Sequence, residues 1–147
     1  MIVHENKTQE VVGMTAKEYL SQARNMQLRI KSMKAQLRTM KDIAEDISPK
    51  QNGTPRTTSP NVHKMESEIV RAIDLDKAIE IENAKFQEIN DVIKKVTHPI
   101  RHAVLVNRYI KGESWAVTAI NINVSISRVY QIHTEALEDV DKIISHL

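Results

Sequence analysis

The sequence predicts an all-α protein in which a long antiparallel helical hairpin or coiled coil is followed by a C-terminal helix-turn-helix. Apolar residues recur at alternating steps of three and four in two long stretches, which is the periodicity of an amphipathic helix. A segment rich in proline separates these stretches. The last third of the chain contains shorter apolar segments, each preceded by a residue suited to begin a helix.

The composition excludes several classes of protein. A chain of 147 residues fits one domain or two small ones, which is too short for a large barrel or a doubly wound enzyme. Three glycines and no cysteine leave no material for glycine-rich phosphate loops, disulfides or cysteine-zinc sites. His98 and His102 lie four residues apart, but Pro99 separates them and no nearby carboxylate completes a metal site. We therefore expect no enzymatic activity, no cofactor and no metal.

The chain offers no apolar run long enough for a signal peptide or a membrane span. The longest aliphatic run is residues 103–106. Because cysteine is also absent, we expect a cytoplasmic protein with no membrane partner.

The first helix is expected to follow a flexible N-terminus at residues 1–14. Thr15 and Glu18 form a capping-box pattern, in which each side chain accepts a hydrogen bond from the backbone N–H of the other. The helix is expected to run to Ile47. Its apolar seam consists of Tyr19, Ala23, Met26, Ile30, Met33, Leu37, Met40, Ala44 and Ile47.

Residues 48–61 contain three prolines and a glycine and are expected to form a mobile linker. A second helix is expected over 62–96. Its expected seam is Val62, Met65, Ile69, Ala72, Asp76, Ile79, Asn83, Phe86, Asn90 and Ile93. Polar residues at three of these positions would fix register or oligomeric state. An alternative is a rotated seam, with burial shared by Ile73, Leu75, Ile81 and Ile89.

The two long helices are expected to bury their seams against each other over residues 15–97. An antiparallel hairpin within one chain satisfies the pattern. A homo-oligomer that pairs the same stripes between chains satisfies it equally well, and we expect the protein to be a homo-oligomer.

Residues 98–147 are expected to form a separate helix-turn-helix domain. Pro99 suits the first turn of a helix that stops at Gly112. Ser114 and Ser125 suit the caps of the next two helices, and Asn123 suits a left-handed turn between them. The last helix, from 126 to about 146, has an inward stripe of Val129, Ile132, Ala136, Leu137, Val140 and Ile144.

This part of the chain resembles region 4 of bacterial sigma-70-type factors. The resemblance lies in Ser114-Trp115, Ala119, Asn123-Val124-Ser125, Arg128-Val129-Tyr130-Gln131-Ile132 and Ala136-Leu137. Ile126 and Ser127 depart from that pattern, because sigma-type recognition helices usually place Arg or Lys and Glu there. Thr118, Ala116-Val117 and Asn123 also replace the usual aliphatic, acidic pair and glycine.

The chain as a whole is similar to phage and prophage proteins of the ArpU and RinA type, which are late-gene transcription regulators. The similarity covers about residues 15 to 142 and includes the runs 15–20 and 59–66 and the Trp115…Val129-Tyr130…His133 pattern. This resemblance implies a phage-encoded, sigma-like, DNA-binding regulator in the cytoplasm of a bacterial host.

The partner implied is double-stranded DNA at a promoter or operator, read by the start of the last helix. The candidate contact residues are Ile126, Ser127, Arg128, Tyr130, Gln131 and Thr134. A glutamine amide such as that of Gln131 can pair with adenine, and Ile126 can touch a thymine methyl. Ser127, Arg128 and Tyr130 can reach phosphates.

The charge of residues 99–147 counts against strong DNA binding, because five bases face five acids. Useful affinity would then require dimerisation or RNA polymerase beside the module. The alternative is an interaction module that binds RNA polymerase, a repressor or another phage protein without touching DNA. A third reading is a small terminase subunit, which also combines a coiled coil with a helix-turn-helix.

Overall fold

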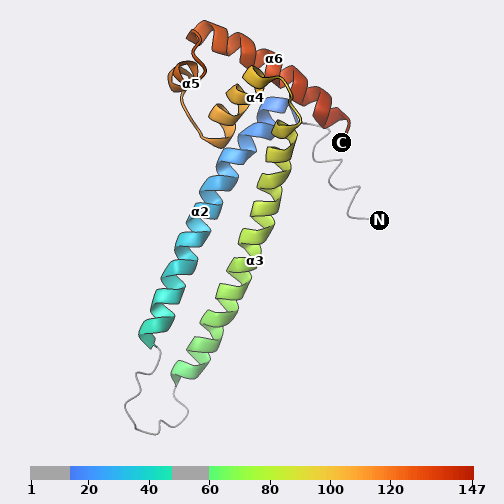
Figure 1. Cartoon of the computed structure of the whole chain (residues 1–147). Coiled ribbons are helices and arrows are strands. Elements are labelled where there is room, and N and C mark those ends of the chain that lie inside the picture. Colours follow the sequence, from blue (N-terminus) through green and yellow to red (C-terminus); the bar gives the residue numbers. More distant parts are fainter. Residues whose placement is uncertain (1–13, 48–59) are drawn as a thin grey trace. The chain divides into compact units, whose positions relative to one another are not determined.

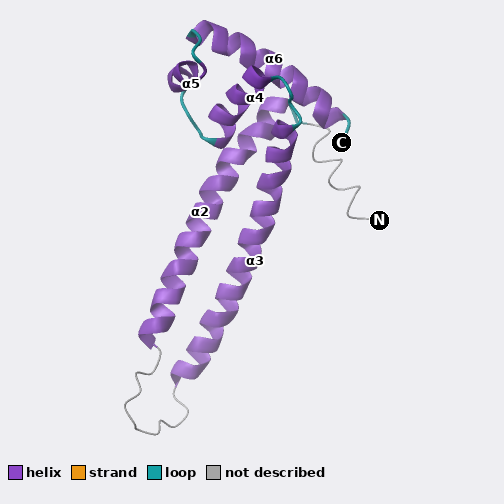
Figure 2. Ribbon diagram, in the orientation of Figure 1, coloured by secondary structure: helices purple, strands orange, loops and turns teal. Residues whose placement is uncertain are grey.

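The computed structural model describes residues 14–47 and 60–147. Within these ranges every regular element is a helix, which confirms the expected all-α fold (Figures 1 and 2). The elements are α2 (Ala16–Ile47), α3 (Pro60–Lys94), α4 (Pro99–Leu105), the π-helical turn η1 (Val106–Ile110), α5 (Trp115–Ile122) and α6 (Ile126–Ser145). None of these helices combines the length and the apolarity needed to cross a membrane.

The expected flexible N-terminus and mobile linker lie almost wholly outside the described residues. Of the segment 48–61, only the last two residues are described, and they begin α3. The second long helix therefore begins two residues earlier than the apolar pattern indicates.

The chain divides into two compact units. The first unit contains the chain up to Gln27 together with Lys85–Leu147, and the second unit contains Leu28–Ala84. Each unit includes a stretch of α2 and a stretch of α3, which run side by side in opposite directions (Figure 1). The expected boundary between residues 97 and 98 does not coincide with this division.

The start of α2 has the capping geometry that its sequence predicts. The Thr15 N–H donates to Glu18 Oε2, and the Glu18 N–H donates to Thr15 Oγ1, both at 3.2 Å. Two N–H groups that a helix start leaves without helical partners are thereby satisfied. The described seam residues of α2 are all buried or half-buried, and Ala16 and Leu20 join them in the first unit.

The face of α3 that packs against α2 differs from the expected seam. Met65, Ala72, Ile79, Phe86 and Ile93 face inward as expected. The positions between them are shifted by one residue along the chain, because the inward side also holds Glu68, Leu75, Glu82, Ile89 and Val96. Asp76 and Ile69 are exposed, which contradicts the expected seam, whereas Asn83 and Asn90 are half-buried beside it.

The alternative rotated seam is correct at two positions and wrong at two. Leu75 and Ile89 share the burial, whereas Ile73 and Ile81 are 50% and 58% exposed. Helix α3 carries aliphatic residues on all of its sides, so the periodicity of the sequence alone does not show which face is buried. In the second unit, Arg29 Nε of α2 forms an ion pair with Glu82 Oε1 at 2.9 Å. This inward carboxylate therefore has a partner on α2.

The core of the first unit joins helices that are distant in sequence. Leu20 from α2, Ile93 from α3, Leu105 from α4 and Val140 from α6 are fully buried in one cluster. Each such side chain contributes about 1.5–3 kcal/mol by leaving water. The C-terminal helices are therefore anchored on the ends of α2 and α3 that belong to this unit.

Candidate nucleic-acid interface

Helix α5 begins at the serine that the sequence predicts as its cap. Ser114 has extended backbone angles, and its Oγ accepts the Val117 N–H at 3.1 Å. The buried Thr118 donates its hydroxyl proton to the Ser114 carbonyl at 2.8 Å, so the hydroxyl is satisfied where an aliphatic is usual. Helix α5 is also tied to η1, since Asn121 Nδ2 donates to Asn107 Oδ1 at 2.8 Å.

The turn between α5 and α6 depends on Asn123, which adopts the left-handed conformation with φ 58° and ψ 49°. The Asn123 N–H donates to the Ile120 carbonyl, and the Val124 N–H donates to the Ala119 carbonyl at 3.0 Å. These two bonds form a Schellman motif, which closes a helix and reverses the chain direction. The expected left-handed residue is confirmed, with asparagine in the place usually taken by glycine.

Helix α6 begins at the second predicted cap, where Ser125 Oγ accepts the Arg128 N–H at 3.2 Å. Behind the cap, the inward side of α6 packs on α4 and α5. The cluster contains Val104, Ala119, Val129 and Ile132, with Trp115, Ile122 and Val124 at its edge. Residues 114–134, here called the α5–turn–α6 segment, are thus two packed helices joined by a tight turn.

All six residues proposed from the sequence to contact DNA are exposed along the start of α6. The exposed fraction is 46% for Ile126 and 48% for Tyr130. Ser127, Arg128, Gln131 and Thr134 are exposed as well. The side chains that could read a duplex are therefore all open to solvent on the first turns of α6.

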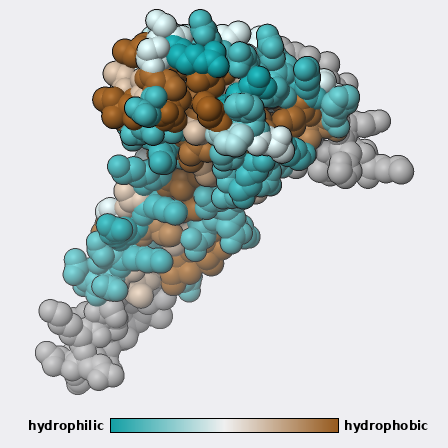
Figure 3. Space-filling model, turned by 45° about the horizontal axis from the view of Figure 1, so that its top comes forward, coloured by the Kyte–Doolittle hydropathy of each residue, from teal (hydrophilic) through white to brown (hydrophobic). Residues whose placement is uncertain are grey.

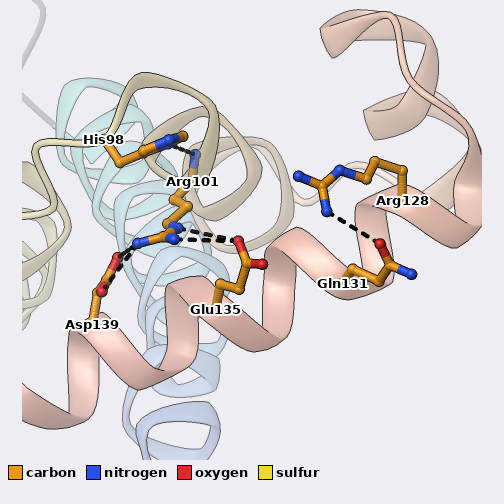
Figure 4. A network of polar contacts seen from close by, with 6 residues as sticks. All are labelled: His98, Arg101, Arg128, Gln131, Glu135 and Asp139. Atoms are coloured by element: carbon orange, nitrogen blue, oxygen red, sulfur yellow. Dashed lines mark hydrogen bonds and ion pairs between the residues drawn. The ribbon is translucent and has the colours of Figure 1, made fainter.

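Two of these residues are bonded to each other. Arg128 Nη1 donates to Gln131 Oε1 at 3.1 Å, and the Gln131 amide nitrogen points away from the arginine (Figure 4). A carbonyl oxygen has two lone pairs, so Gln131 can still accept a second hydrogen bond while its NH₂ donates. The arginine thus orients the amide without using up its hydrogen-bonding capacity.

The charges of α6 are unevenly distributed along the helix. The α5–turn–α6 segment contains no acidic residue, and Arg128 is its one base. The acids of α6 lie further along the helix, where Arg101 of α4 bonds to Glu135 at 3.3 Å and to Asp139 at 3.1 Å (Figure 4). Asp141 accepts the Ala16 N–H at 3.1 Å. Three of these acids therefore hold the fold together.

A buried aromatic and polar cluster supports α6 from beneath. The Tyr109 hydroxyl lies 2.7 Å from His133 Nε2, and the Trp115 ring meets the His133 ring edge-on at 4.8 Å. The Arg108 guanidinium stacks 3.9 Å from the Trp115 ring. Burial, together with the charges of Arg108 and Lys17, lowers the pKa of His133 to about 4.

Sequence reasoning did not find this cluster. Tyr109 and Arg108 lie on η1, whose π-helical geometry has no signal in the sequence. The bond from Tyr109 and the ring of Trp115 fix the position of α6 relative to η1 and α5.

The two spaced histidines have structural partners. His98 caps α4, since its Nδ1 accepts the Arg101 N–H at 3.4 Å, and Pro99 follows it at the first helical position (Figure 4). His102 Nδ1 lies 3.1 Å from the Ile93 carbonyl. The described residues hold no group of three or more histidines and carboxylates placed to bind a metal ion.

An apolar patch borders the exposed start of α6. Ile120 is 77% exposed and Val117 is 38% exposed, both on the outer side of α5. Ala116, Ile120, Val124 and Ile126 line a shallow hollow at the turn. Figure 3 shows hydrophobic side chains gathered where α5 and the start of α6 lie.

Comparison of the chain with family models, curated proteins and solved structures finds no match.

Proposed function

We propose that this protein is a DNA-binding transcription regulator that reads duplex DNA with the exposed start of α6. The observation that carries this proposal is the exposure of Ile126, Arg128, Tyr130 and Gln131 on the first two turns of α6, in a segment without acidic residues. The resemblance to sigma region 4 and to ArpU- and RinA-type proteins adds the context of a phage or prophage regulator in the bacterial cytoplasm.

In this proposal the first two turns of α6 enter the major groove. The helix start carries a partial positive charge, and Arg128 has further guanidinium N–H groups besides the one that is bonded to Gln131; both favour a phosphate. Gln131 pairs with adenine through its oxygen and its NH₂ group, worth about 1–3 kcal/mol of discrimination. Ile126 lies at the first helical position, where it can contact a thymine methyl.

Selection of bound duplexes from a randomised DNA library tests this function. We expect an enriched site in which Gln131→Ala relaxes the preference at one base pair and leaves the others unchanged. Arg128→Ala is expected to weaken binding to all sequences, because it removes a phosphate contact, and to relax the preference read by Gln131 as well, because it removes the hydrogen bond that orients this amide. Gln87→Ala and Arg71→Ala, at exposed positions of α3, are the matched controls. Absence of any enriched site, or equal enrichment by the Gln131 variant, contradicts the proposal.

The exposed patch on α5 favours a second candidate function. Ile120 and Val117 offer an apolar surface beside the turn, which suits a protein partner such as RNA polymerase or another regulator. If α5 binds a protein partner such as RNA polymerase, Ile120→Asp is expected to abolish binding of that partner and to leave the affinity for DNA unchanged. A protein interface of this kind also responds little to salt, whereas phosphate contacts weaken steeply.

A further inference from the structure

The outer face of α3 in the second unit carries a strip of exposed aliphatic side chains. Val70 is 57% exposed and Ile73 is 50% exposed, and Ile69, which is 53% exposed, lies one turn before Ile73. The inward side of the same helix is already packed against α2 through Leu75 and Ile79. A surface helix normally has one apolar face, so this second face calls for a partner.

The residues along this outer face follow one stripe of the helix. They succeed one another at steps of three and four: His63, Glu66, Val70, Ile73, Lys77 and Glu80. All six side chains are exposed. The stripe has an apolar centre, formed by Val70 and Ile73, and two charged or titratable residues on each side of it.

We propose that this stripe pairs antiparallel with the same stripe of a second copy of the chain. A two-fold axis midway between residues 70 and 73 brings Val70 opposite Ile73 of the second copy. The same register sets Glu66 opposite Lys77, and His63 opposite Glu80. In a two-fold interface every such contact occurs twice, so one stripe complements itself along its whole length.

The charges select this orientation over the parallel one. Parallel pairing in register places Glu66, Lys77 and Glu80 each opposite its own copy, which repels at every charged layer. Antiparallel pairing makes Glu66 and Lys77 an opposite-charge contact and places Glu80 beside the imidazole of His63 instead of a second carboxylate. The exposed pairs contribute little affinity by themselves, so the aliphatic centre supplies the attraction and the charges supply the direction.

The pairing of two stripes does not depend on the proposed function. Its expected effect on DNA affinity does rest on the proposal that the start of α6 binds DNA. A dimer carries two α5–turn–α6 segments, and linking two weak contacts raises the overall affinity without a new contact. A module with one base on its reading surface has most to gain from such linkage.

Sedimentation velocity of the full chain without DNA tests the pairing. We expect a concentration-dependent dimer whose dissociation constant rises at least tenfold in Ile73→Asp. Leu28→Asp is the matched control, because Leu28 is 51% exposed but lies on α2 outside the stripe. A wild-type chain that stays monomeric at high concentration overturns the proposal, as does a dimer that Ile73→Asp leaves intact. Far-UV circular dichroism verifies that each variant is folded.

Charge reversal tests the antiparallel register separately. Glu66→Lys and Lys77→Glu are each expected to weaken the dimer, because each creates two repulsive layers. The double variant restores opposite charges in both layers and is expected to recover wild-type association. A parallel dimer would not show this recovery, since like charges still face each other after both changes. Dimerisation without DNA binding would refute the proposed function alone, and DNA binding by a chain that stays monomeric at high concentration would refute this inference alone.

Discussion

Asn123 determines how α5 continues into α6, because its left-handed backbone closes one helix and aims the chain at the next cap. Asparagine tolerates this conformation better than other residues with a side chain, and β-branched residues tolerate it least. The exposed start of α6 therefore depends on the backbone conformation of Asn123.

Replacement of Asn123 measures this dependence. Asn123→Val is expected to lower the free energy of unfolding by about 1–3 kcal/mol, and Asn123→Gly to leave it nearly unchanged. Urea denaturation followed by circular dichroism gives both values. Asn25→Val, at an exposed position inside α2, controls for the intrinsic cost of valine in a helix. Equal effects at both positions would show that the turn is not under this constraint.

His133 makes stability depend on pH in a defined window. Its folded pKa of about 4 lies below the ordinary value of 6.5, so the unfolded chain takes up the proton first as pH falls. Its stabilising contribution is complete above about pH 6.5, is lost as pH falls toward 4, and changes no further below that. At about 1.4 kcal/mol per pKa unit, the loss is on the order of 3 kcal/mol.

The comparison of wild type with His133→Gln isolates this contribution from other titrating groups. We expect the difference in unfolding free energy between the two proteins to shrink as pH is lowered from 7 to 4. Tyr109→Phe removes the hydroxyl at 2.7 Å but keeps the histidine buried, so it should retain most of the pH dependence. A difference that stays constant over this range would contradict the burial of a neutral imidazole.

At the level of helices, α3 shows where burial differs from periodicity. Ile89→Ala is expected to cost about 2–5 kcal/mol, because Ile89 is 2% exposed in the core of the first unit. Ile81→Ala is expected to cost less than about 1 kcal/mol, since that side chain is 58% exposed. Thermal or urea unfolding measures both. Similar costs would mean that the inward face of α3 has been assigned incorrectly.

The helix ends could be predicted from the sequence because their signals are local. Thr15, Pro99, Ser114, Asn123 and Ser125 each act on neighbours within four residues, and the structure confirms all five. The inward face of α3 could not be predicted fully, since exposed isoleucines compete with buried ones for the same periodicity.

Contacts between distant segments leave no local signal. The bonds from Arg101 to Glu135 and Asp139, and the contact between Tyr109 and His133, join residues more than 20 positions apart. The sequence count therefore could not show that two acids of α6, Glu135 and Asp139, share an ion pair with Arg101 of α4. The exposed residues of the candidate site were easier to predict, because they are those left over once the inward stripe of α6 is assigned.

At the level of the whole protein, the net charge of +2 conceals an uneven distribution. Acidic side chains are absent from residues 114–134 and return immediately afterwards at Glu135. This distribution suits a surface that meets phosphate at the start of α6 and is anchored by ion pairs beyond it.

The salt dependence of duplex binding tests the central claim most directly. Affinity for duplex DNA, measured by fluorescence anisotropy at several salt concentrations, is expected to fall linearly on a double-logarithmic plot. Arg128→Ala should weaken binding and reduce the slope by about 1, whereas Arg71→Ala should change neither. Salt-independent binding, or an unchanged slope in Arg128→Ala, would contradict the assignment of the α6 surface to DNA.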